Sequence, residues 1–73
     1  MARVLHLLKA GDPLALSLAG EQQAAGDDVT LVMLPGAPDF TPPPGVTRCR
    51  VPDELSWEAL LERIFESDQV ITW

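Results

Sequence analysis

The chain has 73 residues, a net charge of −6 and an isoelectric point near 4.3. This length suits one domain, so we expect residues 1–73 to fold as a single unit. The acidic balance argues against direct nucleic-acid binding, because phosphate recognition needs clustered cations and only five Lys and Arg are present. One cysteine provides neither a disulfide framework nor a cysteine-based zinc site, so we expect oligomerisation to support the small core.

The first half of the chain carries a β-α-β pattern. Residues 4–8 form an apolar run without helical spacing, which predicts a buried strand. Asp12 supplies an N-cap acceptor, and Pro13 suits the first position of a helix. Residues 14–25, rich in Ala, Leu, Glu and Gln, therefore predict a helix that ends at Gly26.

The predicted first helix has an apolar and a polar side. Leu14 and Leu18 lie one turn apart and are expected to pack, while Ala19 and Gly20 allow a close approach to the sheet. The solvent-exposed side is expected to carry three consecutive polar residues, which are Glu21, Gln22 and Gln23.

A second strand, a loop and a third strand follow. Residues 29–34 are nearly all apolar and rich in β-branched side chains, which is typical of a central strand covered on both faces. Residues 35–45 contain five prolines and two glycines, so we expect an irregular surface loop and no helix. Residues 46–51 alternate in the manner of a strand with one partly solvated face, and Pro52 ends it.

An amphipathic helix and a last strand complete the chain. Capping residues lead into a series of apolar positions with the i, i+3, i+4, i+7, i+8 spacing of a helix: Trp57, Leu60, Leu61, Ile64 and Phe65. We expect this series to pack, and the opposite face carries Glu58, Glu62, Arg63 and Glu66. Residues 69–73 predict a terminal strand.

This order predicts an α/β fold of the Rossmann-like type. Its sheet is expected to be small, mainly parallel and four-stranded, in the order β-α-β, loop, β-α-β, with two helices. Two helices leave part of one sheet face or edge uncovered, which is a second reason to expect a partner. No segment is apolar enough for a membrane span or a signal peptide, so we expect a cytoplasmic protein.

Cys49 and His6 are the candidate reactive groups. Cys49 is predicted on a strand, away from any helix N-terminus that would activate its thiol, and alternation sends Arg48 and Arg50 to the other face. It is either a half-buried small apolar residue or a sulfur carrier. His6 is either a hydrogen-bonded core histidine or a polar contact at a subunit interface, because the sequence places no nucleophile or substrate beside it.

The aromatic residues are candidate interface groups. Trp57 suits a core or interface anchor, and Phe40 stands in an otherwise polar, Pro-rich loop. Trp73 ends the sequence and needs packing, either within the chain or against a partner. We expect no cofactor and no metal, because a P-loop, a dinucleotide fingerprint and a ligand cluster are all missing from the sequence.

The opening and the end of the chain share a set of features: a Leu-His strand, a Gly-Asp before an apolar strand, a Ser-Trp that opens a helix, and a terminal Trp, at residues 4–9, 25–27, 29–34, Ser56, Trp57 and Trp73. In these features the chain resembles the DsrH/TusB-like members of the DsrE/DsrF/DsrH superfamily. The chain departs from that pattern in three places. A helix and a strand are missing after the Pro-rich loop, and residues 35–37 (Pro-Gly-Ala) replace the Gly-Val that usually follows the second strand. Leu16 to Ala19 stand where some relatives carry a sulfur-holding cysteine.

The resemblance implies a small subunit of a cytoplasmic sulfur-relay assembly, of the tRNA-thiolation or sulfur-oxidation type. Because the helix cysteine is missing, a non-catalytic docking subunit with homologous partners or further copies of itself is favoured. The alternatives are a persulfide-carrying sulfurtransferase that uses Cys49, a self-assembling α/β protein of unrelated function, and a shortened relative of nucleotide-binding Rossmann-like proteins.

Overall fold

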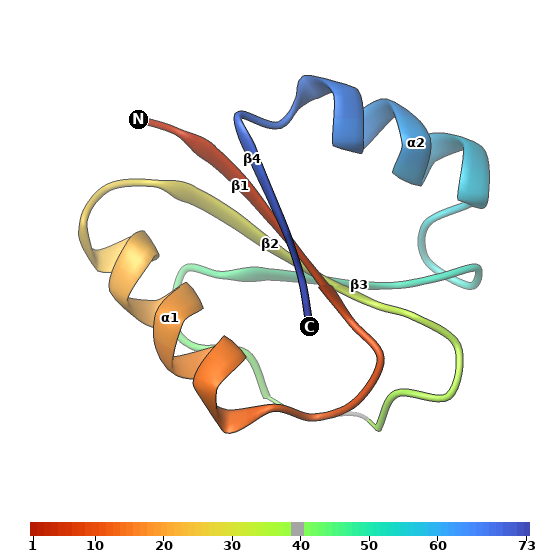
Figure 1. Cartoon of the computed structure of the whole chain (residues 1–73), viewed down its shortest axis with the longest axis horizontal. Helices are drawn as coiled ribbons and strands as arrows, with labels where there is room; N and C mark the ends of the chain where they lie inside the picture. The colour runs from red at the N-terminus through yellow and green to blue at the C-terminus, as the bar shows by residue number, and fades with distance from the viewer. Residues whose placement is uncertain (39–40) are drawn as a thin grey trace.

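Four parallel strands form one sheet in the order β3-β2-β1-β4 (Figure 1). The computed structural model describes residues 1–38 and 41–73. The elements are β1 (Arg3–Leu8), α1 (Pro13–Ala24), β2 (Asp28–Met33), β3 (Thr47–Arg50), α2 (Trp57–Glu66) and β4 (Gln69–Thr72). The predicted α/β fold, with two helices and the order β-α-β, loop, β-α-β, is confirmed.

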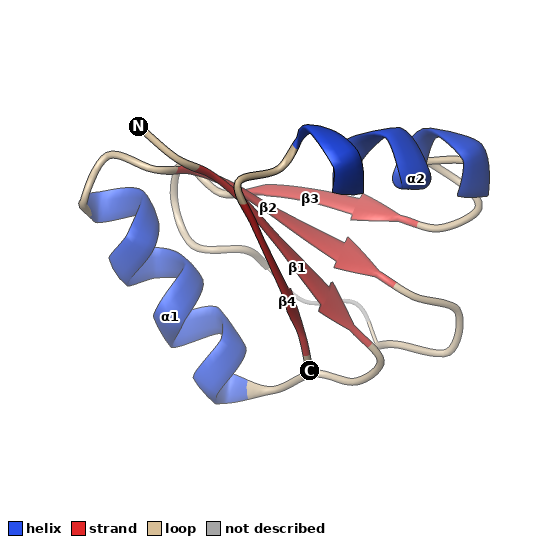
Figure 2. Cartoon of the chain, turned by 45° about the horizontal axis from the view of Figure 1, so that its top comes forward, coloured by secondary structure: helices blue, strands red, loops and turns tan. Residues whose placement is uncertain are grey.

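The two helices lie on opposite faces of the sheet (Figure 2). The apolar runs of β1 and β2 take the central positions because both of their faces are covered. On β1, Val4, His6 and Leu8 face α1, whereas Leu5 faces α2. The alternation of side chains along a strand therefore assigns each residue of the sheet to one helix layer.

Small side chains bring α1 close to the sheet. Ala15 and Ala19 are fully buried one turn apart, and they pack with the α1-facing residues of β1 and β2. The expectation that Leu14 packs is wrong: this side chain is 71% exposed. Leu14 precedes Ala15 by one position, which turns it about 100° away from the buried row of the helix.

Gln22 is a second correction on α1. It was expected on the solvent-exposed side of the helix, but its side chain reaches the fully buried ring of His6. Gln22 lies three residues after Ala19 and so shares the sheet-facing side of α1. A polar side chain is stable on this side because its oxygen has a buried hydrogen-bond partner.

The connection from β2 to β3 packs on the α1 face, and its described residues form no helix. Its described residues, 34–38 and 41–46, include Ala37 and Val46, both of which are buried in the α1-side core. Pro43 lies near the Cα of Gly20, where an added Cβ would stand 3.5–4 Å from the proline ring, in ordinary contact. The Pro-rich segment therefore shares the covering of this face with α1.

The helix α2 begins at a serine cap and packs through a narrow row. The Ser56 hydroxyl accepts a hydrogen bond from the amide of Ala59 at 3.1 Å. Leu60 is buried and Ile64 is half-buried against the core on this side of the sheet. The expectation that the apolar series packs is wrong for Leu61 and Phe65, which are exposed. Trp57, expected as a core or an interface anchor, is exposed as well.

Two aspartates hold the beginning of β1 against its neighbours. Asp27, before β2, accepts a hydrogen bond from the amide of Ala2 at 3.2 Å. Asp68, before β4, accepts one from the amide of Arg3 at 2.7 Å. Both contacts fix the register in which these strands pair with β1. Within the described residues, neither helix has the length and apolar character needed to cross a membrane.

The close approach of α1 leads to a test of packing. Replacing Ala19 with Leu adds three carbon atoms where no space remains, and we expect it to lower the free energy of unfolding by about 1–3 kcal/mol. Ala24→Leu, on the exposed end of the same helix, is the matched control and should change it by less than about 0.5 kcal/mol. Urea denaturation measures both, and equal values would contradict the packing of α1 described above.

Candidate functional site

His6 is the centre of a buried chain of hydrogen bonds. Its Nε2 lies 2.7 Å from the Oε1 of Gln22 on α1, and its Nδ1 lies 2.9 Å from the indole Nε1 of Trp73. The His6 and Trp73 rings are also stacked, with centroids 6.0 Å apart. The three side chains come from β1, α1 and the residue after β4, so the contact joins three separate segments.

The two hydrogen-bond partners of His6 determine the tautomer of its neutral ring. An indole N–H can only donate, so the Nδ1 of His6 must accept from Trp73. The proton of the neutral ring is therefore on Nε2, which donates to the Gln22 carbonyl oxygen. Among the described residues, every buried side-chain nitrogen and oxygen has a hydrogen-bond partner.

Trp73 is held by its backbone as well as by its ring. Its amide donates to the carbonyl of Leu7 at 2.9 Å, and its ring packs against the core on the α1 side. Trp73 was expected to pack either within the chain or against a partner, and the structure places it within the chain. Together, the His6 and Trp73 contacts fasten the end of the chain to the centre of the sheet.

Cys49 lies half-buried on β3, on the face that α2 covers. It pairs in register with Val32 and packs beside the cluster of Leu5, Val32 and Val51. Arg48 and Arg50 pair with Leu31 and Met33, whose side chains face α1, so they point away from the thiol as expected. The surroundings of the sulfur are therefore apolar.

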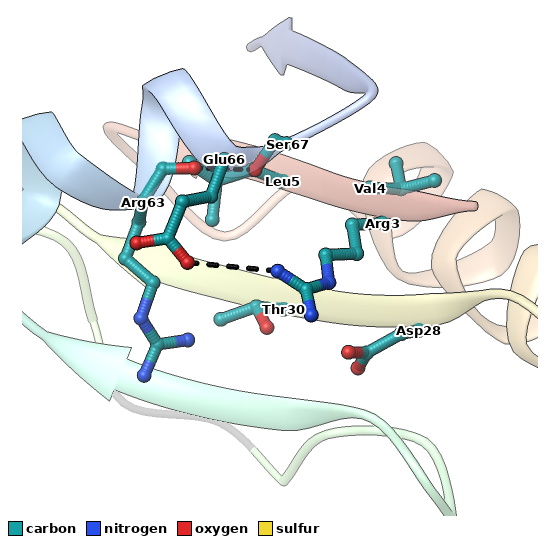
Figure 3. A pocket seen from close by; sticks show the side chains of 8 residues that line it. All are labelled: Arg3, Val4, Leu5, Asp28, Thr30, Arg63, Glu66 and Ser67. Atoms are coloured by element: carbon teal, nitrogen blue, oxygen red, sulfur yellow. Dashed lines mark hydrogen bonds and ion pairs between the residues drawn. The ribbon is translucent and has the colours of Figure 1, made fainter.

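A polar cavity of about 290 Å³ opens on the other side of α2 from β4 (Figure 3). It lies at the beginning of β1 and β2 and is lined by Arg3, Val4, Leu5, Asp28, Thr30, Arg63, Glu66 and Ser67. Arg3 pairs with Glu66 at 3.5 Å across this cavity, and the Arg63 guanidinium extends towards β3 (Figure 3). Both charge signs meet in this cavity, so it has no net preference for an anion or a cation.

The outer side of α2 carries an exposed apolar row, here called the α2 stripe. Its members are Trp57, Leu61 and Phe65, with exposed fractions of 54%, 55% and 80%. The spacing of four residues aligns them along one ridge of the helix. On β4, Val70 pairs with Leu5 and is 37% exposed on the same face of the sheet. An exposed apolar row of this kind is a candidate interaction surface.

The structure places the predicted site residues in different parts of the fold. His6 and Trp73 are brought together, Cys49 lies on the opposite face of the sheet, and Trp57 belongs to the α2 stripe. Phe40 lies outside the described residues. In the described ranges, no three His, Cys, Asp or Glu side chains are grouped as metal ligands.

Sequence reasoning missed Leu61, Phe65 and Val70 as surface residues. A signal was available on α2, because at about 100° per residue its apolar positions spread over an arc of about 140°. A helix that packs on one sheet face buries a narrower arc, so positions at one edge of this arc, which include Leu61 and Phe65, point elsewhere. For Val70, no comparable signal exists in the sequence.

Comparisons of the chain with protein-family models, with curated proteins and with solved structures give no match. The α/β architecture therefore stands on the structure itself, and the DsrH/TusB resemblance stays a prediction.

Trp73→Phe tests the buried chain of hydrogen bonds. It keeps an aromatic ring but removes the N–H that His6 accepts, and we expect the free energy of unfolding to fall by about 1–3 kcal/mol. Trp57→Phe is the matched control on the exposed side of α2 and should cost less than about 0.5 kcal/mol. Chemical denaturation followed by circular dichroism measures both. A Trp73→Phe protein as stable as its control would show that the contact does not hold the strand.

Proposed function

We propose that this chain is a non-catalytic subunit of a protein assembly. The observation that carries the proposal is the α2 stripe, where three large apolar side chains stand in water beside a partly uncovered strand. Exposure of Trp, Leu and Phe on one ridge lowers solubility unless a partner covers them. A chain of 73 residues also has a small core and gains stability from association.

The reactive groups of the chain support a structural role. Both ring nitrogens of His6 are engaged by Gln22 and Trp73, and the ring is fully buried, so it lacks access to a substrate. Cys49 is half-buried beside apolar side chains on the α2 face, whereas Arg48 and Arg50 lie on the other face of the sheet. In this proposal the chain contributes binding surface, and any chemistry belongs to its partners.

We propose further that the assembly is a sulfur relay of the tRNA-thiolation or sulfur-oxidation type. The support for this finer statement is the resemblance of the Leu-His strand, the Gly-Asp turn and the terminal Trp to DsrH/TusB-like subunits. The partners would then be homologous small α/β chains or further copies of this one. The competing proposals are the sulfurtransferase that uses Cys49 and a self-assembling protein of another function.

Purification of the tagged chain from its native cells tests the proposal. We expect it to elute in a complex of defined mass, with small α/β sulfur-relay subunits identified by mass spectrometry. A complex with unrelated subunits would contradict the sulfur-relay statement and keep the assembly statement. A chain that sediments as a monomer at all concentrations, and elutes alone, would contradict both.

Incubation with a persulfide donor tests the enzyme alternative. If the chain is a docking subunit, the intact mass of the wild-type protein should stay unchanged, as should that of Cys49→Ser. A gain of one sulfur atom by the wild type and not by Cys49→Ser would instead identify Cys49 as a carrier.

A further inference from the structure

One helix layer of this fold is incomplete above β4. A helix is about 10 Å wide and neighbouring strands lie about 4.8 Å apart, so one helix covers about two strands. The helix α2 packs on side chains of β1 and β2, namely Leu5 and Val32. On β4, the residues of the same face, Val70 and Thr72, are exposed, whereas Ile71 and Trp73 on the α1 face are half-buried.

The two sides of α2 differ in chemistry. Arg63 lines the polar cavity that opens over β2, next to Thr30. Leu61 precedes Arg63 by two positions and is therefore turned about 200° from it around the helix. The α2 stripe consequently faces the β4 side. A side that lines the charged cavity and an apolar side thus flank the same helix, and the apolar side is turned towards β4, where Val70 is exposed.

We propose that the surface formed by the α2 stripe and Val70 binds an amphipathic helix of a different polypeptide, one that carries a row of Lys or Arg beside its apolar ridge. This inference rests on the proposed function and names the chemistry of the partner. The bound helix would lie beside α2 in the same layer, with Val70 beneath it and Trp57, Leu61 and Phe65 along its flank.

The shape of the surface favours a helix over an added strand. A strand paired with the edge of β4 would extend the sheet in its own plane and leave the space above Val70 and Thr72 open. A helix fills a layer about 10 Å deep, which is the layer that α2 occupies on the neighbouring strands. The four-residue spacing of the stripe presents a straight ridge against which a second helix can pack.

Charge decides what kind of helix fits. Glu58, Glu62 and Glu66 form a second row directly beside the stripe, and Glu66 already pairs with Arg3. Glu58 and Glu62 are therefore the carboxylates that a partner would meet. A second copy would place the same glutamates against each other, and the chain as a whole carries a charge of −6. Anionic lipid headgroups are repelled in the same way, whereas Lys or Arg is attracted.

A synthetic peptide probes the surface directly. The peptide has about 18 residues, enough to hold a helix, with leucines spaced three and four apart and lysines on the adjoining positions. Titrated into the full chain, it should shift the NMR signals of Trp57, Leu61, Phe65 and Val70. The same peptide with glutamates in place of the lysines should bind at least about tenfold more weakly.

Matched variants locate the binding. Leu61→Ser and Phe65→Ser should each weaken binding of the lysine peptide by about tenfold or more, because each removes an apolar contact from the centre of the surface. Leu14→Ser removes a leucine of α1 that is even more exposed than Leu61, and it should change the binding by less than about twofold. All three side chains are exposed, so the fold is expected to survive each change.

Charge reversal gives the sharpest discrimination. The double variant Glu58→Lys, Glu62→Lys should lose affinity for the lysine peptide and gain it for the glutamate peptide. The proposal would be overturned if the double variant bound both peptides with the affinities of the wild type. It would also be overturned if peptide binding left the NMR signals of the α2 stripe unchanged. Self-association of the free chain that Leu61→Ser abolishes would overturn it as well, because the occupant would then be a second copy. If the peptide does not bind while the chain still purifies within a defined complex, the proposed function in assembly stands and only the inference of a helical partner is rejected.

Discussion

A four-stranded parallel sheet has two apolar faces that must be kept from water, and this chain has two helices with which to cover them. Parallel sheets are stable when both faces are covered, and one helix spans about two strands. The remaining strands need another cover. Three features of the structure reflect how its two faces are covered: the packing of the Pro-rich segment, the position of Trp73, and the exposed apolar side of α2.

The α1 face is closed by elements that are not helical. Ala37 and Val46 of the Pro-rich segment join the core beside Ala15 and Ala19, and the Trp73 ring packs on the β4 side. His6 serves this closure, because its two ring nitrogens connect α1 to the end of the chain. Three elements cover the α1 face: α1, the Pro-rich segment and the ring of Trp73. His6, the only histidine of the sequence, binds the ring of Trp73 and so stabilises the fold at the β4 side of this face.

On the α2 face, Val51 and Leu55 of the connection before α2 join the core, but Val70 of β4 stays exposed. On one side of α2, the part of the sheet that no helix covers is lined by charged and hydroxyl side chains, which water can solvate (the cavity of Figure 3). On the other side, Val70 and the α2 stripe remain apolar and exposed. The proposed function in assembly rests on this difference, because exposed apolar side chains are stabilised when a partner covers them.

The sequence by itself determined the elements, their order and the parallel sheet, because apolar runs, caps and prolines act over a few neighbouring residues. The helix starts at Pro13 and Ser56 are read correctly in this way, and the described residues of the Pro-rich segment form no helix, as expected. Tertiary structure alone decided which apolar side chains are buried. Leu14 and Phe65 resemble core residues in sequence but face water, and Gln22 resembles a surface residue but meets His6. Burial depends on the rotation of each helix against a sheet whose strand order, 3-2-1-4, no local pattern encodes.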